Sequence, residues 1–335
     1  MQRLSSRNEY TIGWVCALPH ERTAAIAMLD VEHSRPRDFA QLNADTNSYA
    51  WGHISTTSGV HNVVIASLPT GIYGTSSAAS TAAMMLMSFP KVRFGLMVGI
   101  GAGIPRDGGP DIRLGDVAVS KPVGTSGGVV QYDFVKALQD GQLQRIGSLN
   151  NPPMVLLNAV TAIRGQPQSR VSHYLAEMLR KPHIQNPPQG GRSYSSPGPN
   201  RDVLFPDTYK HRVPGADCSS CDSKIQVIRS PRNSTDPQVH YGVIASGNAV
   251  VKDAAARNRF VQQTGADCIC FEMEAAGLMN SFPCLVIRGI CDYADAHKND
   301  DWQGYAAAVA AAYAKDLLHY VPLQAVNKGS RPRHL

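Results

Sequence analysis

The sequence predicts an α/β fold, a single domain in which a mixed, mainly parallel central sheet is flanked by helices on both faces. Short apolar runs alternate along the chain with segments of helical spacing, which is typical of such sheets. The apolar runs are rich in β-branched residues and cysteine, as buried strands are. With 335 residues and 43% hydrophobic content, the chain can build a sizeable core. We expect the domain to cover residues 8–322.

The expected strands and helices follow in order. A strand over residues 11–17 precedes a helix that begins at Pro19, where proline is tolerated. A strand over 63–67 and a turn at 70–74 precede a second helix, which has one apolar face and stops at Pro90. The remaining expected strands cover 94–98, 116–120, 240–245, 268–271 and 284–287, and an alanine-rich helix covers 302–321.

Two stretches differ from this pattern. Residues 165–237 are dense in Pro, Gly, Ser, Asn and Arg and show no sustained period. Because strand-like segments resume afterwards, we interpret this stretch as a long loop-rich insertion in one domain, and we expect residues 187–199 within it to be mobile. Residues 323–335 are polar and basic, and we expect a disordered tail there.

Composition and charge exclude several classes of function. The net charge of +6 has no accompanying run of Lys and Arg, so we expect no nucleic-acid partner. No apolar stretch reaches the roughly 18 residues of a membrane helix, and the polar start of the chain does not resemble a secretory signal. Seven cysteines cannot all pair, and four lie in strand-like runs, which favours a reducing, cytoplasmic location.

Charged residues follow two of the apolar runs. Glu272 and Glu274 follow one, and Arg288 and Asp292 follow the other. Open α/β sheets bind ligands at strand ends, and charges there are costly unless they are paired or used. Carboxylates that converge with an arginine suggest a polar, sugar-like ligand. For Asp292 a solvated loop remains an alternative, and one of the two glutamates could be salt-bridged while the other meets a ligand.

Other motifs carry weaker signals. Residues 99–103 (GIGAG) follow a strand without the dinucleotide-binding spacing, so they indicate a tight turn or a close backbone approach to a small ligand. Cys218 and Cys221 form half of a metal-binding pattern, with only His211 and His240 as further candidates, and we favour a loop with two thiols. We expect no metal and no organic cofactor. Acyl transfer and ATP-driven phosphoryl transfer are disfavoured because their motifs are absent.

Seven segments in order resemble the nucleoside phosphorylase/nucleosidase superfamily, and most closely its fungal branch, which is often the N-terminal part of NACHT, ankyrin or tetratricopeptide-repeat proteins. The resemblance covers about residues 10–321, with no repeat or NACHT segment attached, and suggests a catalytic module standing alone. The seven segments are residues 13–21 (GWVCALPHE), 68–74 (LPTGIYG), 98–105 (VGIGAGIP), 113–117 (RLGDV), 245–248 (ASGN), 271–275 (FEMEA) and 288–295 (RGICDYAD).

The resemblance implies cleavage of the N-glycosidic bond of purine nucleosides and a role for each matching residue. Asp292 matches the acid that protonates or hydrogen-bonds the purine at N7. Glu274 matches the carboxylate that grips the ribose hydroxyls, and Met273 packs under the sugar. The further expected substrate contacts are Ser246, Asn248 and Val250 around the base, Thr70, Gly71 and Gly101 on the sugar and nucleophile side, and Glu272.

The resemblance leaves the nucleophile open between water and phosphate. Glu21 and Arg288 match the glutamate and arginine that serve water in bacterial methylthioadenosine/S-adenosylhomocysteine nucleosidases. An acid in a first helical turn also complements the helix dipole without any catalytic role. Because a carboxylate repels phosphate and the 70–74 turn holds no arginine, we favour hydrolysis over phosphorolysis. The cations that could still serve phosphate are His20, Arg22 and Arg106.

Further alternatives concern the substrate and the class of protein. The insertion could cover the site, reach a neighbouring subunit, or bind a 5′-phosphate through Arg192, Arg201, Lys210, His211 and Arg212. A nucleoside-sensing or self-association module with little turnover is the alternative to an enzyme, although a binding module would not need all three acids. The family resemblance also implies a homo-oligomer. The preferred base, the 5′ substituent and the number of subunits stay open.

Overall fold

The computed structural model describes residues 2–106, 108–139, 143–166, 169–187, 190–211, 213 and 218–323. Ten strands form one sheet in the order β11-β10-β6-β12-β5-β1-β4-β3-β2, with β7 beside β10, and β8 pairs with β9 in a separate hairpin. The strands are β1 (Ile12–Cys16), β2 (Val31–His33), β3 (Tyr49–Thr56), β4 (Gly59–Ser67), β5 (Phe94–Gly103), β6 (Val117–Ser120), β7 (Val129–Gln131), β8 (Val135–Ala137), β9 (Leu143–Arg145), β10 (Val239–Ser246), β11 (Cys268–Glu272) and β12 (Cys284–Asp292).

The sheet is mixed and mainly parallel, as predicted. β1 lies parallel between β4 and β5, β12 lies parallel to β5, and β10 lies parallel to β6, β7 and β11. The antiparallel pairs are β12 with β6, β11 with β5, and the meander of β2, β3 and β4. Since β11 joins both β10 and the end of β5, the sheet curls back on itself at this end, and the polar residues of β5, β11 and β12 come together.

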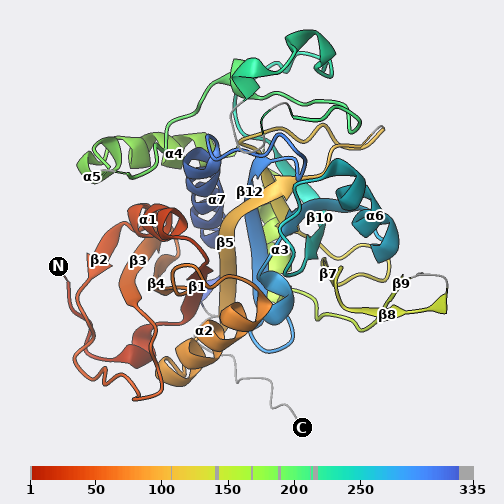
Figure 1. The fold of residues 1–335 in the computed structure, drawn as a ribbon. Coiled ribbons are helices and arrows are strands. Elements are labelled where there is room, and N and C mark those ends of the chain that lie inside the picture. Colours follow the sequence, from red (N-terminus) through yellow and green to blue (C-terminus); the bar gives the residue numbers. More distant parts are fainter. Residues whose placement is uncertain are drawn as a thin grey trace.

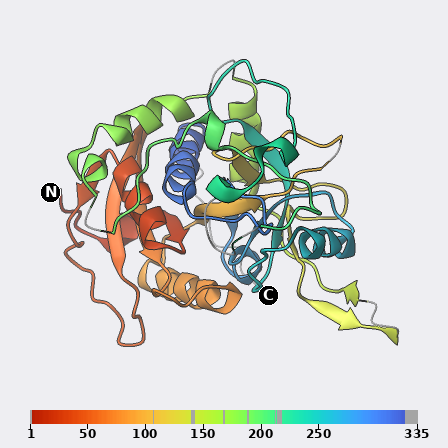
Figure 2. The same ribbon diagram turned by 45° about the horizontal axis from the view of Figure 1, so that its top comes forward.

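Helices cover both faces of the sheet (Figure 1). Apolar residues of α1, α3, α4 and α7 pack with one another and with one face in a single cluster, whereas α2 packs on the opposite face. Figure 2 shows α7 with α1 and α4 packed beside it. The helices are α1 (Pro19–Met28), α2 (Thr75–Ser88), α3 (Met154–Arg164), α4 (Val171–Leu179), α5 (Pro182–Gln185), α6 (Ala254–Thr264) and α7 (Gln303–Leu318).

Two expectations about local structure were wrong. Residues 99–103 form the end of β5 instead of a turn, and their glycines serve close approach: a Cβ on Gly101 would stand 2.6 Å from the Cys270 sulfur. The insertion does contain a helical period, because α4 buries Val171, Tyr174, Leu175 and Met178 at helical spacing. These residues join the cluster around α7, so the first part of the insertion belongs to the core.

Other expectations are only partly covered by the structure. The expected disordered tail lies outside the described residues from 324 onward, as do residues 188 and 189 of the expected mobile loop. Among the described residues, no helix combines the length and the apolar character that crossing a bilayer requires.

Candidate active site

A cavity of about 490 Å³ lies where β1, β5, β11 and β12 bring their polar residues together. Its size is typical of sites for small molecules. The wall combines residues that follow β1, the last part of β5, the ends of β11 and β12, and the loop before α6. The predicted site residues in this wall are Glu21, Gly101, Val250, Glu272, Met273, Glu274, Arg288 and Asp292. Glu21, Glu274 and Asp292, which are distant in the sequence, therefore share one cavity.

Glu21 is fixed at the start of α1 by three backbone N–H groups. Its Oε2 accepts hydrogen bonds from Ala17 (2.7 Å) and Leu18 (2.9 Å), and its Oε1 accepts one from Ile100 of β5 (2.8 Å). Burial raises the pKa of Glu21, while Arg288 and these amides act to lower it. The carboxylate accepts the N–H groups at the start of α1, as an ordinary acid at a helix start would. It also lines the cavity.

Arg288 links the acids on the opposite side. One guanidinium nitrogen, Nη2, donates to Glu272 and to Glu274 (3.2 Å), and Nη1 donates to the Ile100 carbonyl (3.3 Å). Burial acts to lower the pKa of Arg288, but Glu272, Glu274 and Glu21 outweigh it and raise that pKa. A Cβ on Gly99 would stand 2.4 Å from Glu21 Oε1 and 2.6 Å from Arg288 Nη1. Only glycine therefore lets both groups lie against β5 at this position.

Glu272 and Glu274 have different surroundings although both contact Arg288. Glu272 also accepts hydrogen bonds from the backbone N–H groups of Glu274 and Ala275 (3.1 Å each), so it holds the chain turn after β11. For Glu274, burial raises the pKa to about 7; Arg288 opposes this shift, and Glu272 and Glu21 add to it. Glu274 is thus the carboxylate that remains available to a ligand.

Asp292 ends β12 and is paired with a lysine. Its Oδ1 accepts the N–H of Ala294 (2.9 Å), and its Oδ2 lies 2.9 Å from Lys298 Nζ. Ala294 has a positive φ of 53°, which is unusual for a residue with a side chain. Burial acts to lower the pKa of Lys298, but Asp292 outweighs it and raises that pKa to about 12. A charged pair therefore lines this end of the cavity.

Four predicted contacts do not lie in the cavity wall. Thr70 and Gly71 are exposed, and the same turn contributes Tyr73 to the wall instead. Ser246 is buried and its hydroxyl accepts the N–H of Ala276 (2.9 Å). Asn248 accepts the N–H of Thr75 (3.0 Å) and so joins the loop after β10 to the start of α2. Ser246 and Asn248 therefore support the backbone around the cavity.

The insertion supplies part of the cavity's rim. Arg192 lies in the wall and pairs with Asp300 (2.7 Å), and the Tyr194 hydroxyl donates to the His20 carbonyl (3.0 Å). Of the other basic residues expected to meet a 5′-phosphate, Arg201 pairs with Asp301, and neither it, Lys210 nor His211 is in the wall. Arg212 lies outside the described residues.

Sequence reasoning missed Lys298 and Tyr73. Lys298 could have been found as a cation six residues after a strand-end acid, although its contact depends on the turn at Ala294. Tyr73 belongs to a segment that the sequence analysis did single out, so the error concerned only which side chain of the turn faces the cavity.

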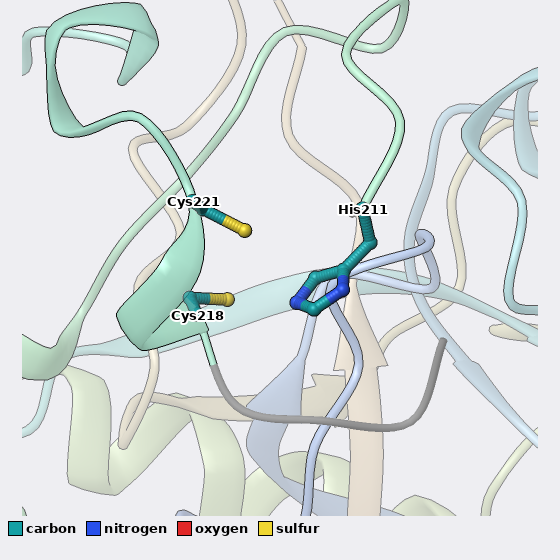
Figure 3. Close-up of side chains that lie close together, drawn as sticks. All are labelled: His211, Cys218 and Cys221. Atoms are coloured by element: carbon teal, nitrogen blue, oxygen red, sulfur yellow. The ribbon is translucent and has the colours of Figure 1, made fainter. Parts of the chain in front are cut away.

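A second group of potential ligand atoms lies in the insertion. The side chains of His211, Cys218 and Cys221 point toward one another (Figure 3), and their ligand atoms lie within 4.8 Å of one another. His240, the other candidate for the Cys pair, instead contacts Asp116 (2.8 Å). Of the two histidines that the sequence offered as partners of the cysteines, His211 therefore lies beside them and His240 does not.

Comparison with known proteins adds independent information. Residues 178–321 match the model of the phosphorylase superfamily. A nucleotide-binding leucine-rich repeat (NLR)-like protein of Hyaloscypha variabilis is 46% identical over 95% of this chain. The ATP nucleosidase Cap17 of Escherichia coli is 32% identical over 28% of the chain. This chain spans only 30% and 20% of the lengths of these two relatives.

Two further relatives are similar over nearly their whole length. A 5′-methylthioadenosine/S-adenosylhomocysteine nucleosidase of Mycobacterium bovis is 24% identical over 93% of this chain and 97% of its own. The solved structure of the corresponding Helicobacter pylori enzyme superposes with a TM-score of 0.56 at 17% identity, covering 93% of this chain and 98% of that one. At this identity the structural match establishes the fold, including the sheet that carries the cavity.

Proposed function

Because the chain belongs to the nucleoside phosphorylase/nucleosidase superfamily, we propose that it is a purine nucleosidase, which hydrolyses the N-glycosidic bond of purine nucleosides to free base and ribose. The observation that carries this proposal is the shared cavity of Glu21, Glu274 and Asp292 beside Arg288. Cleavage of an N-glycosidic bond leaves positive charge on the ribose and negative charge on the departing base. The cavity offers carboxylates for the first and a proton donor for the second.

Glu274 is proposed to bind the ribose. Its carboxylate can accept hydrogen bonds from sugar hydroxyls and stabilise the cation that develops on the ring. Arg288 donates a hydrogen bond to the Glu274 carboxylate (3.2 Å). It does not cancel the negative charge of Glu274, because the same guanidinium nitrogen also donates to Glu272. Met273 lies in the wall between the two acids and offers an apolar surface to the sugar.

Asp292, together with Lys298, is proposed to face N7 of the purine. N7 accepts hydrogen bonds, so a proton delivered there makes the base a better leaving group. Lys298 lies 2.9 Å from Asp292 Oδ2 and holds the carboxyl group in place. In this proposal Asp292 takes a proton from solvent, transfers it to N7 and is left as a carboxylate, and Lys298 positions it.

Glu21 is proposed to activate water as a general base. The same carboxylate disfavours phosphate, whose repulsion from it would be on the order of several kcal/mol at close range. Of the cations that could offset this, Arg22 and Arg106 lie outside the cavity wall. Burial and Arg192 lower the pKa of His20 to about 4, so His20 is neutral near pH 7. These charges favour hydrolysis over the alternative, a purine nucleoside phosphorylase.

The decisive experiment is a chromatographic screen of adenosine, guanosine and inosine with and without inorganic phosphate. We expect free base and ribose in both series, at rates that phosphate does not increase. Ribose 1-phosphate that forms only with phosphate would instead establish phosphorolysis. Binding measured by calorimetry without any product would support the sensing module with little turnover.

A nucleotide substrate is the second candidate. Arg192 and Lys252 line the cavity, and a relative over part of the chain is an ATP nucleosidase. Both side chains could contact 5′-phosphates at the rim. AMP and ATP therefore belong in the same screen, and a kcat/KM for them above that of adenosine would favour this candidate. The homo-oligomeric state and the cytoplasmic location stay predictions.

The activity should depend on pH through Glu274. Its pKa of about 7 in the folded protein means that the proposed ribose-binding carboxylate is largely protonated at pH 6. We expect kcat/KM to fall by about tenfold per pH unit below about pH 7, because the free enzyme then loses the charged acceptor. Glu274→Gln should have low activity that no longer falls with pH in this range. If kcat/KM of Glu274→Gln still fell in the same way below about pH 7, another group would be responsible for the pH dependence.

A further inference from the structure

The insertion carries a cluster that the cavity does not use. His211, Cys218 and Cys221 present one nitrogen and two sulfurs within 4.8 Å of one another. Figure 3 shows the imidazole directed at the two sulfurs, which come from a C-x-x-C segment whose first three residues form one 3-10 turn. Cys218 and Cys221 are not joined by a disulfide bond. We propose that these three side chains form a zinc site that fixes the insertion against the loop that follows Asp292.

The imidazole lacks the partner that such a site would provide. His211 is only 9% exposed, and its Nε2 is buried without a hydrogen-bond partner among the described residues. Buried polar nitrogens are rarely left this way, and an ion or water is the usual explanation. A metal ion between the nitrogen and the two sulfurs would satisfy Nε2 directly.

The types of ligand atom in the cluster indicate which metal ion it would bind. Two thiolates and an imidazole are the ligands of zinc sites, whereas Mg²⁺ and Ca²⁺ prefer oxygen. Tetrahedral zinc places such ligand atoms roughly 3.5–3.8 Å apart. Spacings within 4.8 Å therefore need only small side-chain rotations to close on the ion. Water would fill the fourth position in this arrangement.

Loading the site requires a rearrangement of protons. Nδ1 of His211 lies 3.2 Å from the Val213 N–H, which places the ring proton on Nε2. When zinc takes Nε2, the proton moves to Nδ1 and the Val213 contact opens. The two thiols lose their protons to solvent, so binding weakens as the pH falls.

The cluster lies against the loop that follows β12. Cys218 Sγ contacts the His297 carbonyl (4.0 Å). The His297 ring stacks on the rings of Phe205 and Tyr209, with centroid distances of 4.2 Å and 5.5 Å. Cys218, Asp292 and His297 also line a common second cavity. A metal ion at the cluster would therefore hold residues 205–211 and 218–221 on the segment that positions Asp292 and Lys298.

The test is metal analysis of the full chain purified without chelator and then given zinc. We expect about one zinc ion per chain, and Co²⁺ in its place should produce a thiolate-to-cobalt absorption band. Cys221→Ser and His211→Ala should weaken zinc binding by about 100-fold or more and remove that band. The matched controls are Cys268→Ala, a buried strand cysteine outside the cluster, and His173→Ala, an exposed histidine, and both should retain zinc.

Two results would overturn the zinc site. One is a wild-type chain that binds no more zinc than Cys221→Ser under titration. The other is full retention of zinc and of the cobalt band in both cluster variants. Circular dichroism identifies any variant that fails to fold, and Cys218→Ser then provides a further cluster variant. Neither readout depends on nucleosidase activity, so the outcome is independent of the proposed function.

Discussion

Asp292→Asn is expected to lower kcat for purine nucleosides by about 10²–10⁴-fold while the protein stays folded. Asparagine keeps an oxygen that can accept the Ala294 N–H, so the turn with positive φ at Ala294 should survive. It removes the carboxylate that pairs with Lys298 and that would pass a proton to N7. Steady-state kinetics together with the Tm of both proteins measure the two effects separately.

Asp295→Asn is the matched control for this variant. Asp295 lies three residues after Asp292 in the loop that follows β12, is also buried, and accepts the N–H of His297 (2.9 Å). It is absent from the wall of the nucleoside cavity. We expect its kcat to remain within a few-fold of wild type. Activity of Asp292→Asn within a few-fold of wild type would contradict the role of Asp292 as the acid toward the base.

The central elements of the fold could be predicted from the sequence because they are buried. Strands such as β1, β5 and β12 are continuous apolar runs, and in the structure these runs lie next to one another at the middle of the sheet. The edge was harder to predict: β2 has only three residues, β3 mixes polar and apolar residues without a regular period, and only the second half of β4 was expected. Composition identifies buried strands more reliably than edge strands.

The helices that were missed are α3, α4, α5 and α6, and the first two share a dependence on packing. α4 lies in a polar stretch whose Pro and Gly content suggested loops, and four apolar residues were too few to stand out. α3 precedes it directly and buries its own apolar face in the same cluster. Both are short helices that depend on packing against α7 and the sheet, so local propensity alone does not reveal them.

The residues of the candidate site also differ in how well the sequence predicts them. Glu274, Arg288 and Asp292 could be selected because charges beside buried strands require a reason, whereas Glu21 was selected only through the family resemblance. Contacts such as Thr70 and Asn248 depend on loop geometry, and the structure gives Asn248 to the start of α2 instead. Lys298 reaches Asp292 only because the chain turns back at Ala294. The catalytic and binding roles of all these residues stay predictions until the variants are assayed.

Glu21→Ala is expected to reduce hydrolysis by about 10²–10⁴-fold, because water then lacks its base. The variant also leaves the N–H groups of Ala17, Leu18 and Ile100 without their acceptor. Glu21→Gln is no cleaner, since its NH₂ group would face one of these donors. A loss of activity in either variant therefore has two possible causes, a missing base and a displaced backbone.

Small anions distinguish these two causes. The space left by Glu21→Ala is lined by two N–H donors at the start of α1 and one of β5, which suits an anion. Formate should bind there, restore the amide contacts and act as a base, so hydrolysis should recover with increasing formate. Phosphate, no longer repelled by a fixed carboxylate, should begin to yield ribose 1-phosphate. Hydrolysis by Glu21→Ala near the wild-type rate would instead show that Glu21 serves only to start the helix, and the choice of water over phosphate would need another origin.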